Sequence, residues 1–570
     1  MKKRENIVII VVLIVMVIAI VGVSYAAFRF SQTGNTANTI TTGSITMTYT
    51  ESSNTISING ALPTTDKTGM VRLNEGEYFD FTVSSEIVGD VNINYEISAK
   101  EVGEGTIDGS NIKLYLTKLN DDGSEEGLMT PETYNEESSS NSYTGRPTGE
   151  MSLYTSSMNS SESNNYRLRM YVDEEYNPQG DGGGLTFSVR INVYGQAGDK
   201  YVPLTTQEIL EDNELQEEKE NMFNYASNGN YMDIDTYEEA NNPEYVTNGL
   251  YSMEDEDGTS YYYRGNVDNN NVQFGEYTND YYVYYDGVGR YFQTLESCEA
   301  YTESISYGTC TQVKLASAGD KMYWKIVRVN GDGSLRLIYN GTSTETIAPT
   351  RNNIAGTYAV GISPYTLRSQ NDAPKYAGYT YDRDTNETDS FIKKEVDTWY
   401  SNTLGSSSYD SKVTGGRFCS DSSGYREGTM ITNVFASFDR LVQVMNGFTT
   451  SNSPTLKCPA TSESYGGSYR LKVGLITADE MVLAGESYQT SSNTYLTQLT
   501  QEVVDNSFFT MSPEGVDQID SSSSIYTYSY SYLINGVGTS NASVRPVINV
   551  TTNNGFTSGD GSTSTPYVLS

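Results

Sequence analysis

Histidine is the residue type that most often carries enzyme chemistry, and the 570-residue chain contains none. Without an imidazole, the sequence excludes Ser-His-Asp catalysis, Cys-His catalysis and every zinc site with a histidine ligand. Acidic residues number 73, so many that no single carboxylate pair stands out as a glycosidase pair. We therefore predict a protein that is not an enzyme, with no catalytic residues and no required cofactor.

Four cysteines are the next candidates for chemistry, at positions Cys298, Cys310, Cys419 and Cys458. Their spacing contains no Cys-x-x-Cys pair, so a metal knuckle or a thioredoxin motif fits poorly. An even number of cysteines in an oxidising compartment predicts two disulfides. Three connectivities are possible, and we favour the sequence-local one, Cys298–Cys310 with Cys419–Cys458.

One acidic run could hold a metal ion, through oxygen ligands at Asp382, Asp384, Asn386 and Asp389. Oxygen ligands at alternate positions suit Ca²⁺, but an EF-hand loop needs Gly at its sixth position and Glu at its twelfth. This chain has Glu and Lys at those positions. We predict a solvated loop in which Asp389 caps the following helix, with calcium binding as the alternative.

Tyrosine is abundant, with 48 residues, and three clusters could form a ligand platform: 261–263, 281–285, and a predicted strand face with Tyr526, Tyr528, Tyr530 and Tyr532. Amphipathic rings are favoured at recognition surfaces. The same pattern also arises in half-buried strands, so both interpretations stay open and we assign no ligand-binding residues. Nucleic acid is excluded as a partner because the net charge of −37 repels phosphate.

The element that determines where these residues act is the apolar run from Ile7 to Phe28, which follows Lys2, Lys3 and Arg4. As a helix this run would be ~33 Å long, enough to cross a ~30 Å hydrocarbon core. The basic residues should stay cytoplasmic, so everything after residue 28 is exported. Residues 1–28 are therefore a membrane anchor or a signal peptide, with Ala26 and Ala27 as the candidate processing site. We expect an extracellular cell-surface protein, either anchored or secreted after cleavage.

Residues 29–200 alternate apolar and polar side chains, as in Phe79/Phe81/Val83 and Val91/Ile93/Tyr95/Ile97. A period of two places each set on one face of a strand. Six or more such strands, without helical patterns between them, predict two antiparallel sheets packed face to face. Within this β-sandwich, the Ser- and Asn-rich residues 120–165 are expected to form a long surface excursion.

The start of this region, YAAFRFSQT followed by TGNTANTITTGSITMTYTE, resembles the TasA/camelysin family of bacterial biofilm-fibre and surface proteins. The resemblance covers roughly residues 20–200, and its specific part lies at about 20–50. It implies a jelly-roll or immunoglobulin-like sandwich, and a donated N-terminal strand in members that form fibres. Independently of the family, an extended segment at 27–40 could complete a neighbour's open sheet edge. The alternative is that it pairs within its own domain.

Residues 201–246 change character, because Thr205 and Glu208 match a helix capping box ahead of an acidic run. We predict an exposed helical acidic linker. Residues 247–570 then form a larger mixed region, with residues 280–321 as an insertion carrying the first disulfide. A helix is predicted at 389–405 and a second after Thr477, whose spacing to Glu480 is another capping box.

The C-terminal region carries the motifs YWKIVRVNGDGSLRLIYNG, IKKEVDTWY, GLITADEM and VRPVINV. These resemble poorly characterised bacterial surface domains that are distantly similar to formylglycine-generating-enzyme and C-type-lectin-like folds. The resemblance implies an α+β lectin-like domain and no particular activity. The combined prediction is an exported structural protein of the cell surface, a filament or biofilm-matrix component. The alternative is a surface adhesin that binds glycan or protein through the tyrosine-rich C-terminal domain.

Overall fold

The computed structural model of the chain describes residues 29–33, 38–42, 45–51, 56–59, 63–73, 78–87, 92–103, 105–120, 125–176, 186–198, 204–218, 248–367, 379, 389–419, 432–434, 441, 454–458, 468–485, 507–517, 523–529, 532–537, 541–551 and 555–569. The chain forms two compact units, Met1–Tyr201 and Val202–Ser570. Among the described residues, no helix is both long and apolar enough to cross a membrane. The predicted segment 1–28, with Ala26 and Ala27, lies outside them.

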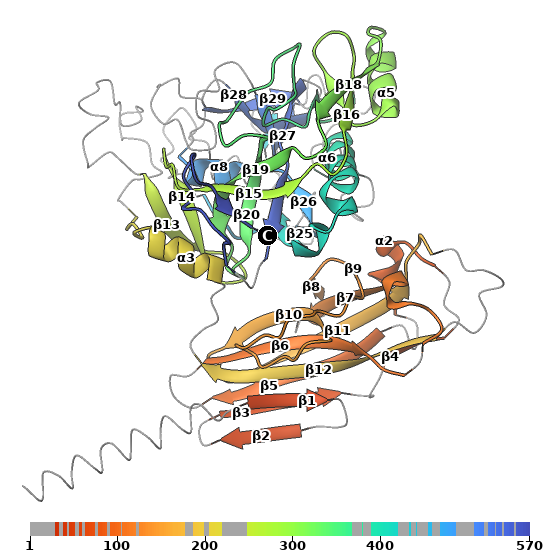
Figure 1. Ribbon diagram of the computed structural model, residues 1–570, viewed down its shortest axis with the longest axis vertical. Coiled ribbons are helices and arrows are strands. Elements are labelled where there is room, and N and C mark those ends of the chain that lie inside the picture. Colours follow the sequence, from red (N-terminus) through yellow and green to blue (C-terminus); the bar gives the residue numbers. More distant parts are fainter. Residues whose placement is uncertain are drawn as a thin grey trace, which may run out of the picture. The chain divides into compact units, whose positions relative to one another are not determined.

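In the first unit, the strands form two antiparallel sheets (Figure 1). One hydrophobic core contains side chains from both sheets. The first sheet has the order β1 (Arg29–Thr33), β12 (Thr186–Gly198), β6 (Asn92–Glu101) and β10 (Met151–Met158), and β4 (Ile56–Asn59) also pairs with β12. The second has the order β2 (Asn38–Thr42), β3 (Ile45–Glu51), β5 (Tyr78–Ile87), β11 (Glu162–Val172), β7 (Ile112–Leu119) and β8 (Glu125–Gly127), and β9 (Glu132–Thr133) also pairs with β7. These two sheets are the predicted sandwich.

The core of this unit follows the alternation in the sequence. Along β5 the side chains alternate between buried and half-buried, with Phe79, Phe81 and Val83 on the core face. Strand β6 differs, because seven consecutive residues are buried. Its second face is covered by chain from the region 134–150, where Arg146 and Thr144 bind Glu96. The expected surface excursion at 120–165 is therefore wrong over this stretch, because ionic contacts between distant residues hold it on the sheet.

The N-terminal strands complete sheet edges of their own unit. Strand β1 pairs antiparallel with β12 from Arg29 opposite Gln196 to Thr33 opposite Asn192. Strand β4 pairs with residues 186–189 of the same strand, and β2 pairs with β3. The structure thus shows the intramolecular alternative for residues 29–33 and 38–42.

The second unit contains two large sheets and a hydrophobic core that includes Trp324 and Trp399. The first sheet has the order β13 (Gly249–Glu254), β14 (Thr259–Arg264), β19 (Lys321–Val329), β20 (Leu335–Gly341), β31 (Val547–Val550) and β22 (Val413–Thr414), joined by β15 (Asn271–Glu276), β26 (Val473–Gly474) and β32 (Tyr567–Val568). The second has the order β18 (Thr311–Ala316), β16 (Tyr281–Tyr285), β17 (Tyr291–Phe292), β21 (Gly361–Pro364), β30 (Asn541–Val544), β27 (Phe508–Asp517), β28 (Ser523–Ser529) and β29 (Tyr532–Val537), joined by β24 (Thr432–Val434). A small sheet pairs β23 (Gly416–Cys419) with β25 (Ser468–Leu471).

Two predicted boundaries differ from the structure. Residues 280–321 are not an insertion, because they supply β16, β17 and β18 of the second sheet together with α5 (Leu295–Ile305). The predicted exposed linker also differs where it is described. Its helix α3 (Leu204–Asp212) buries Ile209 in the core of the second unit. The predicted capping box is wrong, because α3 begins at Leu204 and Thr205 therefore lies inside the helix. The Glu208 carboxylate accepts from the backbone N–H of Phe556 at 2.7 Å.

The two other predicted helices are present, with one corrected cap. Helix α6 (Phe391–Asn402) begins after Ser390, whose hydroxyl accepts from the N–H of Lys393 at 3.1 Å. Asp389 is therefore not the cap; its carboxylate lies 3.3 Å from the Lys393 ammonium. Helix α8 (Ala478–Leu483) has the full capping box predicted between Thr477 and Glu480.

Candidate functional site

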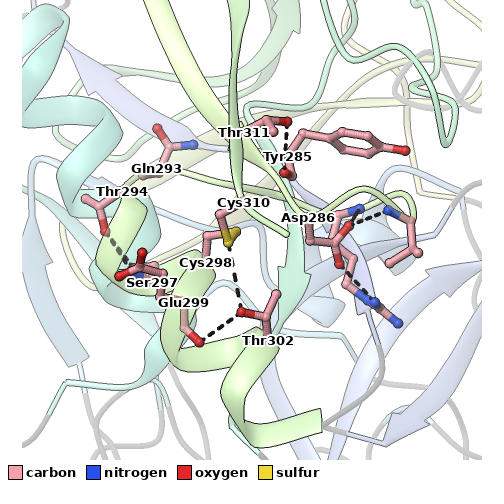
Figure 2. Close-up of a disulfide and its surroundings, with 12 residues drawn as sticks. Tyr285, Asp286, Gln293, Thr294, Ser297, Cys298, Glu299, Thr302, Cys310 and Thr311 are labelled. Carbon is pink, nitrogen blue, oxygen red and sulfur yellow. Dashed lines mark hydrogen bonds and ion pairs between the residues drawn. A yellow bond between two sulfur atoms is a disulfide. The ribbon is translucent and has the colours of Figure 1, made fainter. Parts of the chain in front are cut away.

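The four cysteines form two disulfides in the second unit, Cys298–Cys310 and Cys419–Cys458. These are the pairs that the sequence favoured. Figure 2 shows the first of them, which ties α5 to the residue before β18. The Thr294 hydroxyl caps α5 by accepting from the N–H of Ser297 at 3.0 Å, so Cys298 falls in the first turn and is fully buried. This disulfide fixes a short helix to a sheet edge and leaves no thiolate there.

The chain reverses between α5 and β18 through a tight, well-bonded turn. Ser306 ends the helix in the left-handed region at a φ of 55°, and the N–H of Tyr307 donates to the Thr302 carbonyl at 3.2 Å. Gly308 has a φ of +112°, and a Cβ there would lie 2.9 Å from the Asp286 carbonyl oxygen. The buried Asp286 carboxylate also holds the β16–β17 turn, accepting from the N–H of Arg290 at 3.0 Å and its guanidinium at 2.9 Å (Figure 2).

Glu395 on α6 is a buried carboxyl group that lies at the N-terminal end of α5. It is 1% exposed, and its Oε2 accepts from the N–H of Gln293 at 2.7 Å. Burial raises the pKa of Glu395 to about 7, against smaller lowering effects of hydrogen bonds from Ser297 and Gln293. Because Glu395 gains its charge near neutral pH, the packing of α5 against α6 depends on pH.

The second disulfide borders a cluster of buried charges. Cys419 ends β23, and Cys458 belongs to the segment 454–458. This segment is held to α8 because the N–H of Thr455 donates to Asp479 at 3.0 Å, and Leu456 packs in a small cluster with Leu483. The disulfide therefore keeps the segment 454–458 close to α8.

Glu480 of the capping box lies at the centre of the charged cluster. Its Oε2 accepts from the N–H of Thr477 at 2.9 Å. Its Oε1 pairs with two guanidinium groups, Arg328 at 3.0 Å and Arg336. Burial by itself would raise the pKa of Glu480, but the two arginines lower it overall. One carboxylate thus serves two buried arginines from β19 and β20.

Asp255 supplies the other partner of Arg328 from the turn between β13 and β14. Its Oδ2 accepts from Arg328 Nη1 at 3.0 Å and from the Ser260 hydroxyl at 2.6 Å. Its Oδ1 accepts from the N–H groups of Asp257 at 2.8 Å and Gly258 at 3.0 Å. This carboxylate thus binds donors from its own turn, from β14 and from β19.

Asp257, two residues further along the same turn, binds the arginines of the small sheet. Arg417 contacts it through two nitrogens, at 3.0 and 3.1 Å, and Arg470 lies at 3.3 Å. Burial would raise the pKa of Asp257, but Arg470 and Arg417 lower it. Four arginines from four strands thus meet on one turn and one short helix.

A small polar pocket opens beside this cluster, and we call it the arginine pocket. Its cavity volume is about 20 Å³, and its lining residues are Glu256, Arg328, Arg336, Arg417, Cys419, Thr455, Leu456, Lys457, Cys458, Thr477, Asp479, Glu480 and Ser512. Such a volume is close to that of one ordered water molecule. The pocket suits a small charged group rather than a whole drug-sized ligand.

The metal site and the tyrosine clusters predicted from the sequence have different outcomes in the structure. Asp382, Asp384 and Asn386 lie outside the described residues, and the described part of the chain contains no group of acidic or thiol side chains able to hold a metal ion. Tyr262 and Tyr263 are buried, whereas Tyr282 is 39% exposed. Tyr526 and Tyr528 lie in β28 and Tyr532 in the antiparallel strand β29, so these three tyrosines do not share one strand as predicted. Tyr530 lies outside the described residues.

The arginine pocket was missed because each arginine alone looks like an ordinary strand residue. The usable signals were the Asp-Glu-Asp-Gly turn and the capping box at Thr477, both of which carry carboxylates that the cluster uses. Their distance in the sequence, 213 residues between Asp257 and Arg470, hides the combination. In comparisons with known proteins, no family model and no curated protein matches this chain.

Proposed function

We propose that this chain is an exported, non-catalytic structural protein of the cell surface that assembles by exchanging strand β1 between copies. The observation that carries the proposal is the pairing of β1 with β12. Five residues at the start of the described chain pair with one half of the β12 edge, while β4 occupies the other half. A terminal strand of this length can leave its own sheet and remake the same backbone hydrogen bonds on a second copy.

Two further observations support this proposal. The apolar run 7–28 immediately precedes β1 in the sequence, so processing after Ala26 would leave the strand at a free chain end. Two disulfides in the second unit fit an oxidising compartment. The resemblance of residues 20–50 to TasA/camelysin proteins points the same way.

A cysteine pair across β1 and β12 tests strand exchange. Thr33 and Asn192 lie directly opposite each other, a geometry that a disulfide can span. In the double variant Thr33→Cys with Asn192→Cys, oxidation during assembly should give a ladder of covalent oligomers on a non-reducing gel. Oxidised monomer alone would show that β1 stays in its own unit and would overturn the proposal.

The matched control pairs Thr33→Cys with Gln196→Cys. Gln196 lies opposite Arg29, four residues away along β12, a separation of about 13 Å that no disulfide can bridge. This control should remain monomeric on the gel under the same oxidation. It separates register-specific pairing from random cross-linking of exposed thiols.

A second candidate function is binding of a glycan by the second unit, as an adhesin would do. The arginine pocket favours this candidate, because it places guanidinium, carboxylate and hydroxyl groups around one small opening. The buried state of Tyr262 and Tyr263 weakens the earlier tyrosine-based argument for it.

A further inference from the structure

We infer that the arginine pocket binds the carboxylate of an acidic saccharide, a uronic acid unit being the simplest. This inference deepens the second candidate function and does not depend on strand exchange. It rests on the balance of hydrogen-bond donors and acceptors around the pocket, on the pocket's size, and on the groups at its rim.

The carboxylates inside the cluster have no remaining capacity. Glu480 accepts through both oxygens, from Thr477 and from two arginines. Asp255 accepts from five groups: Arg328, the Ser260 hydroxyl, and the N–H groups of Asp257, Gly258 and Gly331. A carboxylate offers about four lone-pair sites, so neither can accept more.

The arginines, in contrast, still have donors to give. Among the described residues, Arg328 donates through Nε and Nη1, and no acceptor contacts its Nη2. Arg336 shares Glu480 with Arg328, and its Nη1 donates to a neutral acceptor, the Arg417 carbonyl, at 3.0 Å. Burial lowers the pKa of the Arg336 guanidinium to about 10, with Arg328 adding to the effect against the attraction of Glu480. An additional anion would stabilise both guanidinium groups.

The dimensions of the pocket select a carboxylate group rather than a larger anion. A cavity of about 20 Å³ holds little more than one water-sized group, so a ligand can place only its carboxylate oxygens there and leaves the rest of the molecule at the rim. Glu256 and Asp479 line the pocket too, and their charges would repel a dianion such as phosphate more than a monoanion.

The residues at the rim of the pocket favour a saccharide over a peptide carboxyl terminus as the ligand. Glu256, Asp479 and the Thr455 hydroxyl can accept from ligand hydroxyl groups, and the exposed Lys457 can donate to them. The sugar ring next to a uronate carboxylate carries such hydroxyls. A peptide carboxyl terminus would instead place a side chain and one amide against Glu256 and Asp479, and so would give these carboxylates fewer hydrogen bonds in exchange for the water it displaces.

Saturation-transfer NMR on the purified full chain tests the inference with D-glucuronate and its neutral analogue D-glucose. Glucuronate should give saturable transfer, and glucose should bind at least about tenfold more weakly, because it lacks the charged group. Lys457→Gln should weaken glucuronate binding about threefold to fivefold, as expected for one rim charge. Lys314→Gln removes the same charge from an exposed site on β18 and should leave binding unchanged.

Four results would overturn the inference. Equal binding of glucose and glucuronate would exclude carboxylate recognition, and so would the absence of glucuronate binding. Glucuronate affinity that is the same in Lys457→Gln and in the parent protein would place any binding elsewhere. Displacement of glucuronate by N-acetylglycine at equal concentration would assign the pocket to a peptide carboxylate. The gel assay of strand exchange is unaffected by any of these outcomes.

Discussion

Each unit of this protein buries arginine in a charged cluster, and the two clusters solve the problem in opposite ways. In the first unit, Arg146 is 1% exposed and lies between Glu96 and Glu137, with 2.5 Å to each carboxylate. In the second unit, Arg336 is equally buried but shares Glu480 with Arg328. The first cluster has more acceptors than its one guanidinium needs, and the second has more donors than its carboxylates can take.

The surroundings of the two clusters reinforce this difference. Arg146 Nη1 donates to three backbone carbonyls, those of Ser139, Pro147 and Glu150, at 3.1 to 3.3 Å. All of its nitrogens therefore serve to hold one loop on the outer face of β6. The arginines of the second unit instead border an open pocket. The comparison shows that buried arginine has two different effects. Where acceptors are in excess, as around Arg146, it holds a loop on a sheet; where donors are in excess, it lines an open pocket.

The largest effect is expected from Glu480→Gln. This change leaves Arg328 and Arg336 buried with one fewer charge partner, and losing one member of a buried ion pair typically costs about 3–5 kcal/mol. Chemical denaturation followed by tyrosine and tryptophan fluorescence measures the loss. The exposed Glu299→Gln on α5 is the control and should change the stability very little. A loss below about 1 kcal/mol for Glu480→Gln would show that the cluster does not depend on its central carboxylate.

Arg146→Met should destabilise the first unit by about 3 kcal/mol at neutral pH, because Glu96 loses its cation in a buried site. The comparison predicts a difference in pH dependence. Burial raises the pKa of Glu137, the other partner of Arg146, and Arg146 opposes this rise. Without Arg146, the Glu137 carboxylate can take up a proton as the pH falls, whereas a stranded guanidinium cannot lose one. The loss in Arg146→Met should therefore shrink between pH 7 and pH 5, and the loss in Glu480→Gln should not. Parallel denaturation series at both pH values check this, and equal pH responses would contradict it.

Glu395 provides a third case, a buried carboxyl without an arginine. Its pKa is raised from the model-compound value of 4.5 to about 7 in the folded protein. Below pH 4.5 both folded and unfolded forms hold the proton, so the full stabilisation is present there; it is lost as the pH rises through 7. The loss amounts to about 3 kcal/mol between these limits.

Glu395→Gln should remove this pH dependence and stabilise the second unit by about 2–3 kcal/mol at pH 8, since the amide keeps a neutral acceptor for the N–H of Gln293. Thermal unfolding of parent and variant from pH 5 to pH 8 measures the effect. The two curves should converge at the acidic end. Curves separated by the same amount at every pH would assign the effect to packing rather than to ionisation.

The smallest effect is expected at the exposed pair of Lys314 and Asp280, whose side chains are 43% and 41% exposed and 2.6 Å apart. Exposed ion pairs contribute about 0–1 kcal/mol, because water screens the attraction. Lys314→Gln should leave the free energy of unfolding unchanged within the error of a denaturation measurement. A larger loss would mean that the β18 edge depends on this pair, and would make Lys314→Gln unsuitable as the binding control.

The sequence predicted well those features that depend on neighbours along the chain. Alternation over residues 79–83 correctly assigned Phe79, Phe81 and Val83 to one face of a strand. The capping box at Thr477 and the helix around Trp399 are also present. The error at Asp389 was one residue, because Ser390 and Asp389 are both good caps and only the geometry of the first turn selects between them.

The sequence alone determined the alternating strands of the sandwich and the absence of imidazole side chains, since each follows from residue type and short spacing. It favoured the local disulfide pairs among three connectivities, and the structure shows those pairs. Only the tertiary structure decided that α3 buries Ile209 in the second unit, that residues 280–321 build a sheet, and that Asp257 meets Arg417 and Arg470. The physical reason is the distance along the chain over which each interaction acts. Backbone periodicity and capping act over a few residues, whereas burial and ion pairing join segments whose separation along the chain carries no local pattern.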